Sequence, residues 1–265
     1  MLRDITLGQY YNVDSLVHRL DPRTKLVGTL IYIITIFMFR DPKIYIPVLL
    51  FLIFTVKLSK VPARYILRGL KPIWILLFIT AFFNVFLTKG EVIFSFWRLS
   101  VTKEGLFNGF FLCARLALLV TGSSVMTLTT TPTELTDGLE SLLKFLKKIR
   151  VPVHEIAMMM SIALRFIPIL MEELDKIMKA QMARGASFDS GNMIKRVKAM
   201  VPLIIPLFIS AFRRANDLAL AMEARCYRGG EGRTKMKPLK YKRCDASAYI
   251  VLLIYLLIVI FVHLI

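Results

Sequence analysis

Two segments of this 265-residue chain end in nearly the same pattern, an alanine and an arginine followed by a small residue. The first reads Ala183-Arg184-Gly185 and the second Ala224-Arg225-Cys226, each at the end of a stretch with helical periodicity. Small neighbours let another backbone come close, and a guanidinium can hold a carboxylate through two parallel hydrogen bonds. The pattern predicts that both helix tips dock into acidic grooves of another protein.

A simpler interpretation of the two arginines stays open. A cation at the C-terminus of a helix is stabilised by the helix dipole by about 0.3–1 kcal/mol and needs no partner. That effect explains one arginine, but it gives no reason for two helices to repeat the same small residues around it. The repetition favours docking.

Composition places these helices in a membrane protein. Apolar residues make up 56% of the chain, and they gather in long blocks that lack the polar face of a soluble helix. The blocks are Val27–Phe39, Ile44–Val56, Ile73–Leu87, Gly109–Leu128 and Ala246–Ile265. The sequence therefore predicts an all-α polytopic membrane protein with about five membrane helices and long amphipathic cytoplasmic helices.

The basic residues set the expected orientation. The net charge is +18, and cations concentrate between the second and third apolar blocks, as in cytoplasmic loops of membrane proteins. The N-terminus and the loop around Lys60 are then cytoplasmic, as is Arg233, while Lys89 is external. A short apolar piece, Val92–Trp97, is expected to lie in the outer interface as a hairpin or a short helix. No motif for nucleic-acid binding accompanies the charge.

The long segment after the fourth apolar block is also helical, but its helices are amphipathic whereas the membrane blocks are apolar throughout. Thr131-Pro132-Thr133-Glu134 is typical of a helix start, with a threonine N-cap, proline at the first position and a glutamate that closes a capping box. Two longer helices are expected over residues 154–184 and 194–228. Three regions follow, namely membrane helices over 1–128, a coupling-helix module over 129–245, and a last membrane helix over 246–265.

Several segments together resemble one family, the transmembrane T component of energy-coupling factor (ECF) transporters, in its shared-module form. The two tips are similar to that family's paired Ala-Arg-Gly motifs. Four further segments agree, in order along the chain: His18–Lys25, Thr130–Gly138, Pro152–Glu155 and Arg165–Pro168. Cys226 departs from the pattern because it stands where the family has glycine, which makes a positive-φ helix cap less easy.

The resemblance implies a function in the prokaryotic cell membrane. The chain would be the multi-pass scaffold of an ABC-type importer for vitamins and other micronutrients. It would bridge two cytoplasmic ATPases, which bind the ATP and magnesium, and membrane S components, which bind the substrate. The docking residues would be Ala183, Arg184, Gly185, Ala224, Arg225 and Cys226.

Four other residues are candidates for coupling or for structure. Asp21 and Pro22 fit the N-cap and first residue of the first membrane helix. Arg165 and Pro168 fit a snorkelling cation and a kink. Arg115 is a charge within an apolar block, and such residues are functional candidates unless they snorkel from one end.

No enzyme is expected from the sequence itself. The chain has no glycine-rich phosphate-binding loop, so ATP hydrolysis must come from partners, and no cofactor is expected on this chain. Three separated histidines and three separated cysteines predict neither a metal site nor a disulfide framework. The alternative is a secondary transporter that carries its own substrate, which would need interrupted helices with polar residues at mid-depth. A membrane enzyme ranks third.

Overall fold

The computed structural model divides the chain into two compact units. We call residues 8–142 and 239–265 the bundle unit, and residues 143–238 the hairpin unit. The backbone alone is described at 92–96, 99–101 and 193–197. The structure describes residues 10–39, 41–88, 90–96, 99–186, 188, 193–230, 236 and 238–264.

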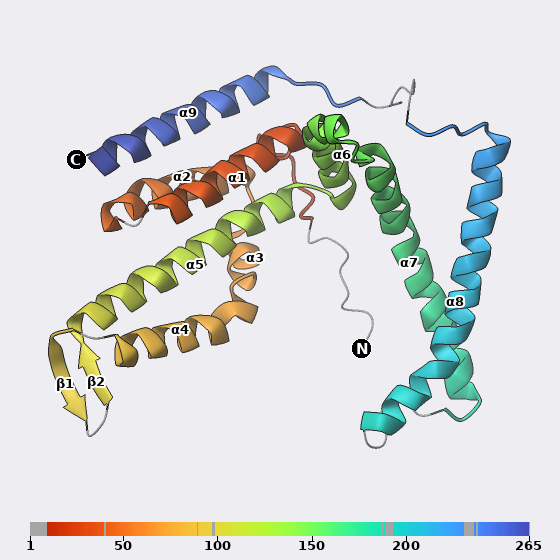
Figure 1. Cartoon of the computed structure of the whole chain (residues 1–265), viewed down its shortest axis with the longest axis horizontal. Helices are drawn as coiled ribbons and strands as arrows, with labels where there is room; N and C mark the ends of the chain where they lie inside the picture. The colour runs from red at the N-terminus through yellow and green to blue at the C-terminus, as the bar shows by residue number, and fades with distance from the viewer. Residues whose placement is uncertain are drawn as a thin grey trace. The chain divides into compact units, whose positions relative to one another are not determined.

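The bundle unit consists of helices with one small sheet (Figure 1). Its helices are α1 (Pro22–Met38), α2 (Tyr45–Ser59), α3 (Ala63–Arg68), α4 (Trp74–Leu87), α5 (Lys103–Thr129), α6 (Pro132–Leu143) and α9 (Arg243–Leu264). Short 3-10 turns, Pro42–Ile44 and Lys71–Ile73, lead into α2 and α4. The five apolar blocks of the sequence fall on α1, α2, α4, α5 and α9, and the polytopic helical class is confirmed.

The core of the bundle unit lies where α1, α2, α5 and α9 meet. Tyr32 is buried there, and its hydroxyl donates to the Leu118 carbonyl at 3.1 Å. Gly122 permits this contact because a Cβ at that position would lie 2.3 Å from the Tyr32 ring. The hydroxyls of Thr35 and Tyr255 share a hydrogen bond of 2.7 Å between α1 and α9. These contacts join α1, α5 and α9, and the buried Val48 and Leu52 of α2 complete the same core.

Six helical stretches are long and apolar enough to cross a membrane by length and composition, counted over the described residues. They exceed the five expected crossings because they include α7 (Val153–Ala183) and much of α8 (Met193–Ala224), while α1, at 17 residues, is too short to count. Large apolar side chains cover the outer faces of α2, α4 and α9, as expected next to lipid.

A two-stranded antiparallel hairpin joins α4 to α5. Its strands are β1 (Val92–Phe96) and β2 (Leu99–Thr102). The Thr102 side chain accepts the Gly105 N–H as the N-cap of α5 and donates to the Thr88 carbonyl at 2.8 Å. The sequence predicted either a hairpin or a short helix for this segment, and the structure has the hairpin. Lys89 and Trp97, like Arg233, lie outside the described residues.

Helix α6 begins as its sequence predicts. The Thr131 hydroxyl accepts the Glu134 N–H, and the Glu134 carboxylate accepts the Thr131 N–H, both at 3.2 Å. Its Gly138 lies so close to α1 that an added Cβ would be 3.0 Å from Pro22. By packing, α6 therefore belongs to the bundle unit. The predicted region boundaries at 129 and 245 concern the side of the membrane and stay predictions.

The hairpin unit is an antiparallel pair of long helices. A 3-10 turn, Lys144–Ile149, precedes α7, and α8 returns along it. Both helices start and end within four residues of the predicted 154–184 and 194–228. Glu173 of α7 joins the helices near their middle, because its carboxylate accepts from the Ser210 hydroxyl and lies 3.0 Å from the Arg214 guanidinium of α8.

Candidate functional site

The tip of α7 ends in a Schellman motif built around the first predicted docking segment. Arg184 is the C-cap residue, and Gly185 follows with a left-handed φ of +90°. The Gly185 N–H donates to the Met182 carbonyl and the Ala186 N–H to the Gln181 carbonyl, each at 3.0 Å. This pair of bonds satisfies the last free carbonyls of the helix and turns the chain sharply away.

The tip of α8 ends in the same motif. The N–H of Cys226 donates to the Glu223 carbonyl at 2.8 Å, and that of Tyr227 to the Met222 carbonyl at 3.0 Å. Cys226 takes the left-handed position with a φ of +55°, where α7 has a glycine. The sequence flagged this position as less easy for cysteine, and the cap forms there all the same. The two tips are therefore alike in backbone hydrogen bonding as well as in sequence.

All six predicted docking residues lie on the surface of the hairpin unit. Ala183, Arg184 and Gly185 are exposed on one tip, and Ala224, Arg225 and Cys226 on the other. Within the described part of the chain, neither guanidinium has a hydrogen bond or an ion pair. Each tip thus presents an unpaired, fully charged fork beside small residues, which is the arrangement that binds carboxylates bidentately.

The two tips lie at opposite ends of the hairpin (Figure 1). Gly230, just past the α8 tip, touches His154 at the start of α7, where an added Cβ would lie 2.4 Å from the imidazole ring. The α7 tip lies toward the other end of the helix pair. Counted from the contact of Glu173 with Arg214 at 1.5 Å per residue, the tips are roughly 35 Å apart. The structure does not bring the two arginines into one site.

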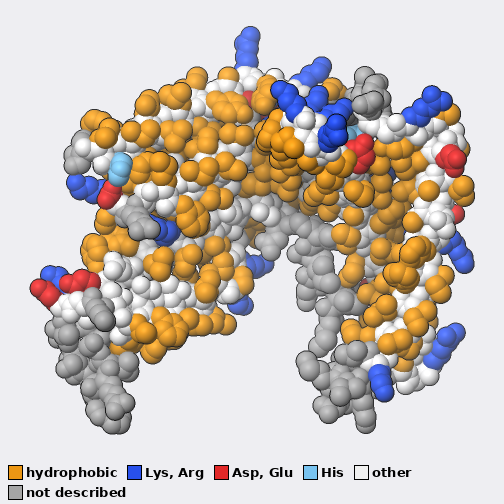
Figure 2. Space-filling view, in the orientation of Figure 1, with side chains coloured by type: hydrophobic (Ala, Val, Ile, Leu, Met, Phe, Trp, Pro, Cys, Tyr) orange, Lys and Arg blue, Asp and Glu red, His pale blue; other side chains and the backbone are white. Residues whose placement is uncertain are grey.

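Between the tips, both helices expose apolar side chains, many of them visible on the hairpin unit in Figure 2. The rings of Phe208 and Phe212 lie side by side with centroids 4.7 Å apart and remain more than half exposed. A cavity of about 250 Å³ separates the two helices next to Phe166 and Leu218. Other exposed apolar residues are Ile156, Met159, Met160, Met200, Val201, Ile204, Ile205 and Ile209.

The Glu173–Arg214 pair was not predicted from the sequence. The sequence feature that could have indicated it is a carboxylate on an otherwise apolar helix face. Ile162, Phe166 and Leu170 precede Glu173 at intervals of three and four residues, and all three line the cavity next to α8. An acid in that stripe indicates a polar partner on the facing helix.

The candidates Asp21 and Pro22 have clear structural roles. Asp21 is the N-cap of α1, where its side chain accepts the Arg23 N–H, and Pro22 is the first helical residue. The Asp21 N–H is held in turn by the buried carboxylate of Asp245 at 2.8 Å. These bonds tie the start of α9 to the start of α1. A further coupling role for either residue stays a prediction.

Arg165 and Pro168 lie on the exposed surface in the middle of α7. Pro168 has no N–H, so the Leu164 carbonyl has no partner four residues on. Within the described residues Arg165 has no ion pair or hydrogen bond, in keeping with a snorkelling side chain. Their part in coupling stays a prediction.

Arg115 is accounted for by contacts inside the bundle unit. Its guanidinium donates to the Tyr45 hydroxyl at 3.0 Å and to the carbonyl of Phe39, the C-cap of α1, at 3.4 Å. A cation at a helix C-terminus is favoured by the dipole. Arg115 therefore satisfies the end of α1.

Among the described residues no group of three or more metal-ligating side chains occurs.

Comparisons with known proteins agree with this architecture. A model of the CbiQ family, described as cobalt transport protein, matches residues 14–236. A protein of Clostridium kluyveri is 55% identical over 250 residues, which are 94% of this chain and 93% of the relative. A protein of Bacillus subtilis is 50% identical over 256 residues, 96% of each chain.

Both of these relatives carry the name energy-coupling factor transporter transmembrane protein, as does a protein of Acidaminococcus fermentans that is 54% identical over 253 residues, 96% of this chain and 94% of that relative. The matches run through the bundle unit and the hairpin unit, and they include both arginine tips. The family expected from the sequence motifs is confirmed, and the chain belongs to the transmembrane components of energy-coupling factor transporters.

Proposed function

We propose that this chain couples two ATPases to substrate-binding S components, and that its two arginine tips each dock into a different ATPase. The observation that carries the proposal is the pair of matching Schellman tips, each with an exposed and unpaired arginine, at opposite ends of one hairpin. A separation of roughly 35 Å lets two globular subunits bind without overlapping.

The hairpin unit has the construction of a lever. Glu173 and Arg214 join the two helices, and the arginine of each tip is exposed on either side of that junction. Closure of an ATPase pair would move the two tips relative to each other. The helices would transmit this movement to their exposed apolar faces, around Phe208 and Phe212, and thereby tip or release an S component that rests there.

Exposed apolar surface with methionines suits exchange between several partners. Met159, Met160 and Met200 are flexible side chains on that surface, and such side chains repack against partners of different shape. The same chain would then serve several S components, with the nutrient determined by the S component. Its basic loops would face the cytoplasm, where the ATPases are.

Co-purification in mild detergent tests this proposal. The full chain, expressed with the ATPases of its organism, should carry both of them in equal amounts. Uptake should require their ATP hydrolysis, and different nutrient limitations should bring different S components into the complex. A chain that purifies without ATPases and transports a substrate alone would support the secondary-transporter alternative instead.

A further inference from the structure

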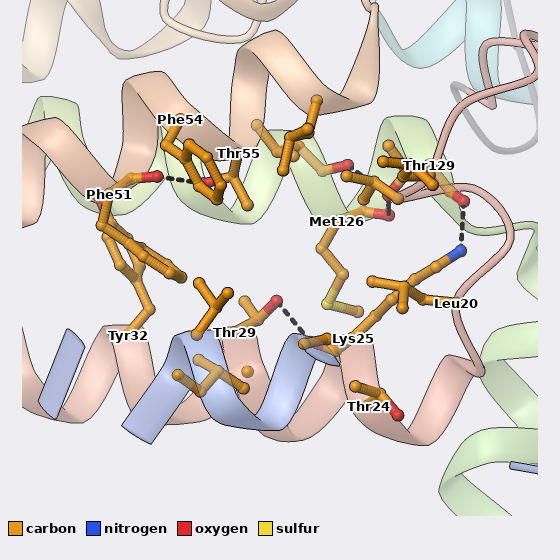
Figure 3. A pocket seen from close by; sticks show the side chains of 18 of the residues that line it. Leu20, Thr24, Lys25, Thr29, Tyr32, Phe51, Phe54, Thr55, Met126 and Thr129 are labelled. Carbon is orange, nitrogen blue, oxygen red and sulfur yellow. Dashed lines mark hydrogen bonds between the residues drawn. The ribbon is translucent and has the colours of Figure 1, made fainter. Parts of the chain in front are cut away.

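The bundle unit contains a cavity of about 370 Å³ between α1, α2, α5 and α9 (Figure 3). That volume is within the range of small-molecule sites in proteins. Lys25 and Thr129 lie at one end of the cavity and Tyr32 and Phe51 at the other. Met126 projects between the two ends. The cavity therefore has one end with a charge and an apolar remainder.

The apolar end is closed and the sides are open to the surroundings of the helices. Phe51 and Tyr255 stack with ring centroids 4.3 Å apart, which joins α2 to α9 at the closed end. Leu16 and Phe54, which also line the cavity, are 57% and 47% exposed. Leu16 lies in the turn before α1, and Phe54 lies on the membrane helix α2, where such exposure is to lipid. An acyl chain can enter here from the bilayer.

Lys25 makes the other end unusual. The residue is only 7% exposed, and its ammonium donates to the carbonyls of His18 at 3.1 Å and Thr129 at 2.8 Å. An ammonium has three donors, so one remains. Within the described part of the chain no carboxylate lies within 4.0 Å of it. Buried charges are ordinarily paired, and this one has carbonyl partners alone.

The nearest acids are already used by backbone groups. Glu134, Asp21 and Asp245 act on Lys25 through space. Asp245 accepts the N–H groups of Asp21 and Lys242, at 2.8 and 2.7 Å, while Asp21 caps α1 and Glu134 caps α6.

Further cations flank the charged end. Arg243 precedes the lining residue Cys244, and Arg19 precedes the lining residue Leu20 and lies 3.7 Å from Asp14. Both arginines are exposed, and their charge next to lining residues favours an anion over a cation at this end.

We propose that this cavity binds one anionic phospholipid, with an acyl chain along Met126 and Tyr32 and the phosphate at the Lys25 ammonium. The acyl chain buries apolar surface that α2, α5 and α9 leave open, and the phosphate accepts from the third donor of the Lys25 ammonium. A lipid that wedges α1, α2, α5 and α9 in this way would stabilise the bundle unit, and only an anionic headgroup would do so fully.

Lipid retention on the full chain in nanodiscs tests the proposal. The nanodiscs hold equal amounts of phosphatidylglycerol and phosphatidylcholine, and native mass spectrometry counts the lipids that stay bound after ejection. The wild type should retain one phosphatidylglycerol. Lys25→Met should lower the preference for phosphatidylglycerol by at least about tenfold, the factor expected for one hydrogen bond to a charged group. Lys57→Met, which removes an exposed cation of α2, is the matched control.

A second variant keeps the test decisive if Lys25→Met does not fold. Met126→Trp fills the cavity and should abolish retention of both lipids, whereas Leu30→Trp, at a 59% exposed position of α1, should retain the phosphatidylglycerol. Added inorganic phosphate should not displace the lipid, because the acyl chain of the lipid contributes most of the binding free energy. Equal retention of the two lipids by the wild type, retention by Met126→Trp, or displacement by phosphate would each overturn the proposal.

Discussion

The two tips of the hairpin unit are built alike from different residues. Each ends in a Schellman motif with an arginine at the C-cap and a left-handed residue after it, but that residue is Gly185 on α7 and Cys226 on α8. A residue with a Cβ is strained in the left-handed region by about 1–2 kcal/mol, and glycine is not. Because the α8 cap forms despite this cost, the hydrogen-bond pattern decides the backbone, and the small side chain leaves the surface beside Arg225 open.

Reversing the charge of both arginines should have the largest effect. Each guanidinium is expected to meet a carboxylate in a different ATPase, and removing one partner of a desolvated charge pair costs about 2–5 kcal/mol of binding free energy. Arg184→Glu and Arg225→Glu should each weaken assembly, and the double variant should lose the sum because distant sites are additive. Binding of purified ATPases to the full chain, followed by uptake assays, measures both effects.

Arg213→Glu is the control for those variants. It makes the same charge reversal at an exposed position in the middle of α8 and should leave assembly unchanged. If the double variant binds ATPases and supports uptake at wild-type rates, the docking role is wrong, and the arginines serve their helix dipoles alone.

The exposed thiol of Cys226 allows one tip to be followed separately. Cys113 and Cys244 are half-buried, so a maleimide should modify Cys226 first. Binding of the ATPase pair should slow that reaction strongly, because the docked groove covers the tip. Mass spectrometry of the labelled chain gives the rate at each cysteine.

The same measurement separates the tips. In Arg225→Glu the protection of Cys226 should be lost, whereas in Arg184→Glu the second tip still docks and protection should remain. Equal loss of protection in both variants would show that the tips bind as one unit rather than separately.

Local signals in the sequence predicted the helices and the tips because their causes are local. The capping box of Thr131 and Glu134 depends on residues three apart, and the stop at Gly185 depends on the last turn of α7. The second long helix was expected to reach residue 228, but α8 ends at Ala224 because the cap forms at Cys226. The lengths of α7 and α8 followed from uninterrupted periodicity in the same way.

Contacts between distant residues could not be predicted in that way. Glu173 meets Arg214 across the hairpin, and Asp245 holds the backbone of Asp21 from more than two hundred residues away along the chain. The hydropathy pattern of a helix does not identify the residue that faces Glu173 or Asp245 from another helix. The placement of the tips at opposite ends depends on the antiparallel pairing, which single-helix patterns do not contain.

Exchanging the residue types at the two caps should have effects of opposite sign. Gly185→Ala should weaken the α7 cap by about 1 kcal/mol through backbone strain alone, because no atom lies within 4 Å of the added Cβ. Cys226→Gly should relieve strain and strengthen the α8 cap by a similar or smaller amount, since glycine also loses more entropy on folding.

Hydrogen exchange at single amides measures these changes. The Ala186 and Tyr227 amides donate the hydrogen bonds of the two caps that span five residues. The first should exchange faster in Gly185→Ala and the second more slowly in Cys226→Gly, with the opposite tip unchanged in each variant. Faster exchange of the Tyr227 amide in Cys226→Gly would mean that the thiol itself stabilises the cap.

Neutralising Glu173 should give the smallest effect and should act on both tips at once. The Glu173 side chain is 25% exposed and the Arg214 side chain is 41% exposed, so the ion pair contributes less than about 1 kcal/mol to stability. Glu173→Gln keeps an acceptor for the Ser210 hydroxyl but loosens the junction between α7 and α8. With spin labels at positions 184 and 225, the distribution of distances between the tips should broaden around an unchanged mean near 35 Å. Glu172→Gln, an exposed neighbour outside the junction, should leave the distribution as in the wild type. A shifted mean in Glu173→Gln would show that this pair sets the separation of the tips rather than limiting their motion.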